Sequence, residues 1–302
     1  MSANSSFSTL DLHLSSMNTS LPLYMHCLIS KPSSLIYRAF SIIIIFLVLP
    51  VCILILQHGL QEWRKKGSTF MEVTLSHSDC FTYNIVIMDL FAVLACVVTY
   101  CGSIMNNLNI LIYPFIFFSF ACFGQIFFHM LTCVEHYMAA VHPITYRSLR
   151  KGRGVRIRII SIGCVWLLCF ALTGFITIKD IILAIVNFFL MILFLTISSF
   201  CSLSVLCVLI HPGPGEESRN RDRVDQSKKR AFYTIVTILG MLVLKFVWDL
   251  YWSVVYITGA HLGCVLMSSG AWFNLPSSLL LPLFLLHRTG KFGCCKNNTQ
   301  RD

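Results

Sequence analysis

Seven stretches of this 302-residue chain are apolar over the length of a membrane-crossing helix, and this feature constrains the fold most. A bilayer's hydrocarbon core is about 30 Å thick, so a helix needs roughly 20 apolar residues to cross it. The stretches lie at about 36–57, 81–102, 108–134, 157–177, 182–210, 230–257 and 263–286. With 56% hydrophobic and 12% charged residues, the composition is typical of a chain solvated by lipid. We therefore expect an all-α integral membrane protein, a bundle of seven transmembrane helices.

The positions of the basic residues predict how this bundle is oriented. Nineteen of the 23 lysines and arginines fall in the C-terminal segment or in the loops after the first, third and fifth stretches, with Arg158 and Arg230 counted at the loop boundaries. Loops on the cytoplasmic side carry such an excess. We therefore expect an extracellular tail at 1–35, a seven-transmembrane domain at 36–286 and a cytoplasmic tail at 287–302. The charges favour contact with anionic membrane lipids. Their scatter over four segments argues against nucleic acid as a partner.

Covalent modification is predicted near both ends of the chain. Asn4 and Asn18 each begin an Asn-X-Ser/Thr glycosylation sequon on the expected extracellular side. Cys294 and Cys295 follow a short basic segment just after the last stretch. This arrangement is typical of palmitoylation on a helix that lies in the membrane interface. We therefore expect a short amphipathic cytoplasmic helix after the last span.

Three segments carry a resemblance to a known family. They are "YNIVIMDLF" in the second span, "CVEHYMAAVHPITYRSLR" at the end of the third, and Trp166 in the fourth. The chain resembles the rhodopsin-like (class A) G-protein-coupled receptors over roughly 36–295, and "AVHPITYRSLR" is most similar to the purinoceptor-related branch. The resemblance implies a divergent, orphan-like cell-surface receptor in the plasma membrane. Such a receptor would bind an extracellular ligand and pass the signal to a heterotrimeric G protein by helix rearrangement.

The resemblance implies that Glu135, His136 and Tyr137 form a latch at the cytoplasmic end of the third helix. The family usually has an arginine where His136 stands. Arginine is permanently charged, whereas histidine is mostly neutral near pH 7. We therefore expect a resting latch that is weak at neutral pH and a G-protein contact that is also weakened. Of these opposing effects, we expect the lost coupling to dominate, so that His136→Arg raises the response.

The resemblance also assigns an activation core and a cation site. Asp89, Trp248 and Pro282 match positions of the activation core. Asp89 matches an aspartate that helps to hold a sodium ion in the family, and Gln125 and Ser277 fall at co-ligand positions. The remaining co-ligand positions hold no side-chain oxygen, and such cations prefer several oxygen ligands. The alternative is an Asp89 that is protonated, or hydrogen-bonded to Gln125 and Ser277.

The sixth stretch carries two charges, Lys245 and Asp249, four residues apart on one helix face. Ionisable groups within a membrane span are costly and indicate function by default. Two interpretations remain open: a self-neutralising pair that also bonds a neighbouring helix, or the polar floor of a ligand pocket. Aromatic residues near that floor favour a small apolar or lipid-like ligand, and the pocket candidates beside the two charges are Tyr251, Trp252 and Trp272.

Fourteen cysteines are present, most of them inside the spans. Within spans we interpret them as small apolar residues. Cys27 and Cys264 both lie on the expected extracellular side, and the resemblance implies a disulfide between them. Cys101 remains a competing partner.

Two other functions compete with a signalling receptor. His136 is compatible with a receptor-like protein that no longer signals and acts by pairing with other receptors. A transporter or proton pathway could use four buried polar residues: Asp89, His129, Lys245 and Asp249. The chain has no internal repeat to support that reading. No nucleophile elbow, phosphate-binding loop or metal motif is present, so we expect neither an enzyme nor a cofactor, apart from the sodium ion considered above.

Overall fold

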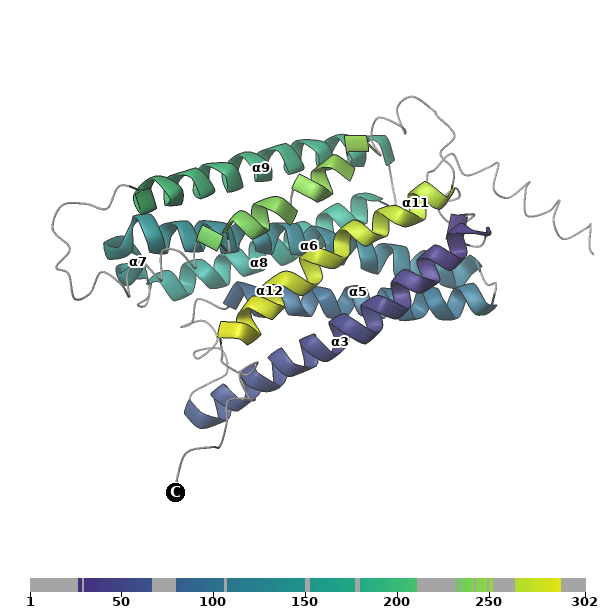
Figure 1. Ribbon diagram of the computed structural model, residues 1–302, viewed down its shortest axis with the longest axis horizontal. Helices are drawn as coiled ribbons and strands as arrows, with labels where there is room; N and C mark the ends of the chain where they lie inside the picture. Colours follow the sequence, from purple (N-terminus) through teal and green to yellow (C-terminus); the bar gives the residue numbers. More distant parts are fainter. Residues whose placement is uncertain are drawn as a thin grey trace, which may run out of the picture.

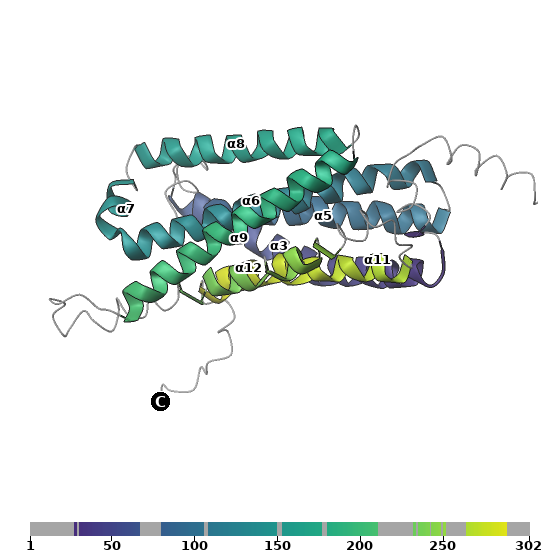
Figure 2. The ribbon, with the colours of Figure 1, turned by 90° about the horizontal axis from the view of Figure 1, so that it is seen from above.

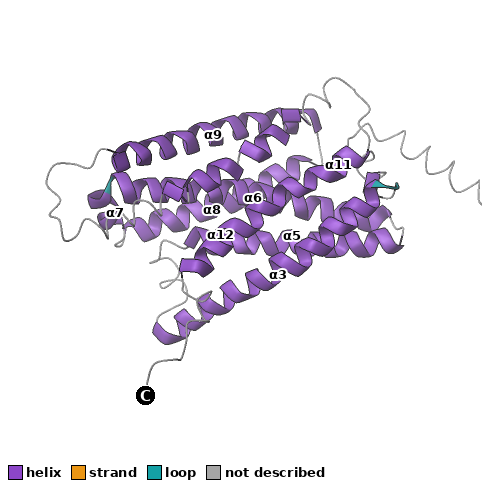
Figure 3. Ribbon diagram, viewed as in Figure 1, coloured by secondary structure: helices purple, strands orange, loops and turns teal. Residues whose placement is uncertain are grey.

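The computed structural model describes most of the membrane-spanning part of the chain. The described residues are 27–28, 30–66, 80–105, 108–149, 153–176, 180–210, 264–288 and, between 232 and 251, all except 234, 242 and 249. Nearly all of them are helical and none is in a strand (Figure 3). The expected all-α fold is therefore confirmed for this part of the chain.

Five helices in the described segments are long and apolar enough to cross a membrane. They are α3 (Ser33–Lys66), α5 (Cys80–Met105), α6 (Leu108–Val141), α8 (Arg153–Ile176) and α9 (Asp180–Ile210). A helix needs no partner for its backbone groups in lipid, because all its hydrogen bonds are internal. These helices indicate a membrane-embedded protein and match the first five predicted spans.

The two remaining predicted spans have a different form. The sixth is represented by a shorter apolar helix, Ile235–Trp248. The last is divided into α11 (Cys264–Gly270), a 3₁₀ turn η1 (Ala271–Asn274) and α12 (Leu275–Arg288). The segment after Arg288, including the expected interfacial helix, lies outside the described residues.

Helix α6 lies in the middle of the bundle (Figures 1 and 2). It packs against α5, α8 and α9, while α3 packs against α5, α11 and α12. The last span, yellow in both views, runs alongside α3. A short helix, α7 (Pro143–Leu149), follows α6 after the single non-helical residue His142. Proline is well suited to the first position of a helix, where its missing N–H leaves no bond unmade.

The apolar core has two parts. The larger surrounds α6, and phenylalanines such as Phe128, which is fully buried, contribute much of it. The smaller lies between α3 and α5 and extends to the last span through Trp272. The indole of Trp166 on α8 donates a hydrogen bond to Asn84 of α5 at 3.2 Å. This bond fixes the rotation of α8 against the second span.

A disulfide joins Cys27 to Cys264, as the resemblance implied. The competing candidate Cys101 is free and exposed. The hydroxyl of Ser33, at the start of α3, donates to the carbonyl of Cys27. The chain just before α3 is thereby tied to the start of the last span. We call this end of the bundle the Cys27 end, and the opposite end, near Val141 of α6, the Glu135 end.

Candidate functional site

Five polar residues from four helices meet inside the bundle, and we call them the central polar network. Asp89 comes from α5, Gln125 from α6, Lys245 from the sixth span, and Ser277 and Ser278 from α12. None is more than 6% exposed. The network therefore links four helices through groups that are shielded from solvent and lipid.

Gln125 is the centre of this network. Its side-chain nitrogen donates to Asp89 Oδ1 at 2.6 Å and to Ser278 Oγ at 3.0 Å. Its side-chain oxygen accepts from Lys245 Nζ at 3.2 Å and lies 3.3 Å from Ser277 Oγ, which shares its one proton between this oxygen and the Asn274 carbonyl at 2.8 Å. A glutamine amide has two N–H donors and two acceptor lone pairs, so all four are used. Because an ammonium group only donates, the amide oxygen must face Lys245.

The network holds one acidic and one basic side chain joined through a neutral amide. A buried charge is tolerated when it is paired and hydrogen-bonded. The predicted bond from Lys245 to a neighbouring helix is confirmed, with Gln125 as the partner. Asp249, the other member of the predicted pair, lies outside the described residues. His129, one turn along α6 from Gln125, is 1% exposed, and neither of its ring nitrogens has a hydrogen-bond partner among the described residues.

The three sodium candidates, Asp89, Gln125 and Ser277, do come together, but their arrangement does not fit a sodium ion. Asp89 Oδ1 and the Gln125 amide oxygen already accept hydrogen bonds from protein donors. A hard cation requires several oxygen ligands. The ammonium of Lys245 also places a positive charge on the oxygen that such an ion would use. Of the alternative, the hydrogen bond between Asp89 and Gln125 is present, Ser277 lies against Gln125, and the protonation of Asp89 stays a prediction.

Trp248 of the activation core lies against the last span. Its ring stacks on Phe273 with 5.4 Å between centroids and contacts Tyr251 at 5.7 Å. A Cβ atom built on Gly270 would overlap the Trp248 indole. The glycine therefore creates the space that the indole fills. Pro282, the third core candidate, is buried within α12.

The pocket candidates fall into different environments. Lys245 is engaged by Gln125, and Tyr251 is 42% exposed beside Trp248. Trp272 packs edge-on against Phe40 of α3, with 5.8 Å between ring centroids. Trp252 lies outside the described residues. A ligand pocket at this level stays a prediction.

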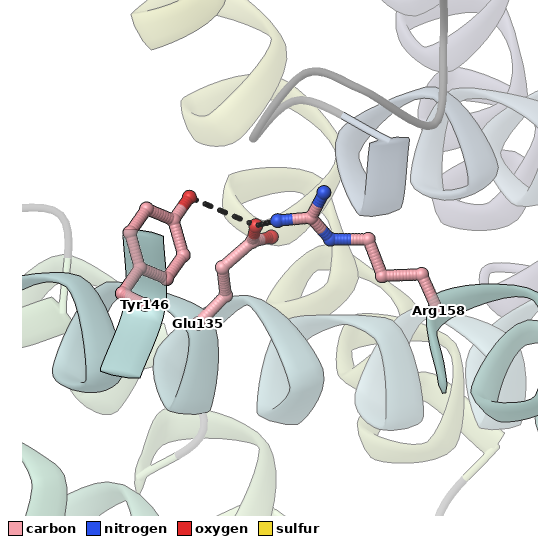
Figure 4. A network of polar contacts seen from close by, with 3 residues as sticks. All are labelled: Glu135, Tyr146 and Arg158. Atoms are coloured by element: carbon pink, nitrogen blue, oxygen red, sulfur yellow. Dashed lines mark hydrogen bonds and ion pairs between the residues drawn. The ribbon is translucent and has the colours of Figure 1, made fainter. Parts of the chain in front are cut away.

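A second polar cluster lies at the Glu135 end (Figure 4). Arg158 of α8 donates to Glu135 Oε1 of α6 at 2.6 Å, and the two side chains are 7% and 8% exposed. The Tyr146 hydroxyl of α7 donates to the same oxygen at 3.2 Å. We call these three residues the Glu135 cluster. It fastens α7 and α8 to the third span.

This cluster contains a partner that the prediction of a latch weak at neutral pH did not include, and the strength of the latch stays a prediction. That prediction considered only the neighbouring His136 as the partner of Glu135, whereas Glu135 also forms an ion pair with Arg158. A guanidinium remains charged at every physiological pH, so the pairing does not depend on histidine protonation. Tyr137 makes ring contacts with His142 at 5.7 Å and with Phe200 at 5.8 Å.

Arg158 and Tyr146 were missed as site residues, although a signal for Arg158 was present. The predicted fourth span, 157–177, already enclosed Arg158, which was counted only as a loop charge. A basic residue inside a predicted span needs an acidic or carbonyl partner. For Tyr146 no comparable signal exists, because tyrosines are common at membrane interfaces.

No protein-family model matches the chain, and a search of curated proteins found no match. Within the described segments, no group of three or more His, Cys, Asp or Glu residues could hold a metal ion. The predicted modification sites lie outside these segments; they are Asn4, Asn18, Cys294 and Cys295.

Proposed function

We propose that the chain is a plasma-membrane receptor with seven transmembrane helices and an extracellular N-terminus. It binds an extracellular ligand and signals to a heterotrimeric G protein. The supporting observation is that α6 takes part in both polar clusters, through Gln125 in one and Glu135 in the other. These residues lie about 15 Å apart along the helix axis at 1.5 Å per residue. A shift of α6 therefore changes both clusters together.

In this proposal the two clusters hold the resting state. A ligand bound near the Cys27 end moves Trp248 and the rest of the sixth span. This movement separates Lys245 from Gln125. The shift of α6 then separates Glu135 from Arg158 and exposes a surface for the G protein at the Glu135 end. A ligand changes such an equilibrium only by its difference in affinity for the two states. The hydrogen bonds of the resting state set how large this difference in ligand affinity must be.

Ligand-independent signalling tests the proposal before any ligand is known. The full chain is expressed in cells with sensors for each class of Gα subunit, at matched surface expression. Arg158→Gln removes the ion pair, destabilises the resting state and should raise basal signalling at least tenfold, since 1.4 kcal/mol is a factor of about ten. Arg156→Gln is the matched control, because Arg156 is exposed two residues earlier on α8.

Basal signalling that stays at the background level in both variants, with normal surface expression, would contradict a signalling receptor. It would favour a receptor-like protein that acts by pairing with other receptors. His136→Arg distinguishes the two further, because it should restore a G-protein donor and raise the response of a receptor that couples weakly. An unchanged response would mean that other contacts couple this chain.

The proposed orientation has its own test. An epitope tag before Met1 should be stained on intact cells, and a tag after Asp302 should be stained only after permeabilisation. This expectation follows from the excess of basic residues in the proposed cytoplasmic loops. The reverse staining pattern would overturn the orientation.

A further inference from the structure

We propose that Lys245 is the built-in counter-cation of Asp89, so that the centre of the bundle needs no metal ion. Removal of Lys245 converts the same residues into a binding site for a monovalent hard cation such as sodium. Lys245 has this role whether or not the chain couples to a G protein.

The first step is the charge balance. Asp89 is 0% exposed and Lys245 is 6% exposed, and both hydrogen-bond to the single side chain of Gln125. His129 is a buried titratable group one turn away. We take it as neutral, the ordinary form of histidine near pH 7, so it adds no charge to the network. In this proposal Asp89 is ionised, so among the described residues of the network one carboxylate balances one ammonium. A second cation would leave the network with an uncompensated positive charge, which is costly in a low-dielectric interior.

The second step is the competition for oxygen atoms. The Gln125 amide oxygen accepts from Lys245, and Ser277 Oγ lies 3.3 Å from the same oxygen while it donates its single proton at 2.8 Å to the Asn274 carbonyl. Asp89 Oδ1 accepts from the Gln125 nitrogen. Asp89 Oδ2 accepts no hydrogen bond from the described residues. Lys245 supplies the positive charge that a cation would otherwise bring to these oxygens. The wild-type network therefore disfavours a metal ion by its charge, and Lys245 also occupies an acceptor site on the Gln125 oxygen.

The third step is the effect of removing the ammonium. In Lys245→Met the methionine fills a similar volume without a charge or a donor. Asp89 then lacks its counter-charge, and the Gln125 oxygen loses one donor. The remaining oxygens are those of Asp89, Gln125 and the hydroxyls of Ser277 and Ser278. A single carboxylate among neutral oxygens suits a monovalent ion, because one positive charge balances it.

The test is the thermal unfolding of the purified full chain in detergent, with sodium replaced by choline at constant ionic strength. The wild type should unfold at the same temperature in both salts. Lys245→Met should unfold at a lower temperature in choline and recover as sodium is added. The recovery should be saturable, because a ligand that binds only the folded state stabilises it by RT ln(1 + [L]/Kd).

Two further variants separate a specific site from a general salt effect. Asp89→Asn combined with Lys245→Met should lose the sodium response, because the carboxylate is gone. Lys245→Arg keeps the charge and should remain insensitive to sodium. Wild-type protein with a saturable rise in sodium would overturn the proposal. A folded Lys245→Met protein with no response would overturn it as well.

Poor folding of Lys245→Met also gives a decisive result. Lys245→Gln retains a donor for the Gln125 oxygen without a charge, and the same sodium response is expected of it. Variants that fold in sodium but not in choline would support the proposal. Failure of both variants to fold in either salt would contradict it, since sodium is expected to supply the missing charge.

Discussion

Replacing Gly270 by alanine tests how closely the last span packs against Trp248. Gly270 has ordinary helical angles, with φ −62° and ψ −29°, so the backbone accepts an alanine. The added methyl group, however, would overlap the Trp248 indole. The indole also stacks on Phe273, so it can move only if this contact is repacked. The substitution is therefore a steric probe of the tryptophan.

The magnitude follows from two opposing effects. Inserting a methyl group into a filled space costs about 1–3 kcal/mol. Replacing glycine by alanine within a helix raises the free energy of unfolding by up to about 1 kcal/mol. Gly270→Ala should therefore lower the free energy of unfolding by about 1–2 kcal/mol on balance. Gly240→Ala is the matched control, because nothing lies within 4 Å of a Cβ atom there. It should raise the free energy of unfolding by about 0.5–1 kcal/mol.

The assay is unfolding of the full chain in detergent, followed with a thiol-reactive dye. Cys52, Cys96 and Cys133 are free and buried, so they react only when the bundle opens. Adding Trp248→Phe to Gly270→Ala should recover part of the loss, because phenylalanine is smaller. The reasoning is refuted if Gly270→Ala and Gly240→Ala stabilise the chain equally.

Two further predictions use the same assay. Arg158→Met should cost about 3–5 kcal/mol, because it leaves Glu135 buried without its counter-charge, and adding Glu135→Leu should restore much of the loss. Tyr146→Phe, which removes one hydrogen bond, should cost only about 1 kcal/mol. A double variant less stable than Arg158→Met would argue against the pairing. Cys264→Ser should cost about 2–4 kcal/mol. Further loss on adding Cys27→Ser would mean that the two cysteines act separately.

The apolar stretches predicted the helices well because the hydropathy of a segment depends on whether lipid or water surrounds it. The predicted stretch 81–102 lies within α5 (Cys80–Met105), and 108–134 lies within α6 (Leu108–Val141). The third helix continues to Val141 because helical hydrogen bonding extends past the lipid into the polar interface. Hydropathy measures where a helix leaves the lipid, and it does not measure where the helix itself ends.

The polar partners were less predictable, because they depend on how each helix is rotated about its axis. Lys245 and Gln125 are separated by 120 residues, and only packing decides that they face each other. The resemblance did place Asp89 and Gln125 at one site, and they are hydrogen-bonded. Glu135 was paired with its chain neighbour, whereas adjacent residues on a helix do not face one another. Its ion-pair partner, Arg158, comes from another helix.

The small contact surface of α8 determines which of its residues natural variation can change. Only 17% of its most apolar window is buried. The buried side chains include Arg158, Val165, Cys169 and Thr173, whose spacing puts them on one face of the helix. The other faces meet lipid, where one apolar residue serves as well as another. In a library of all single substitutions, α8 should accept most apolar changes outside this face. Only the few residues on the buried face should therefore be constrained in sequence.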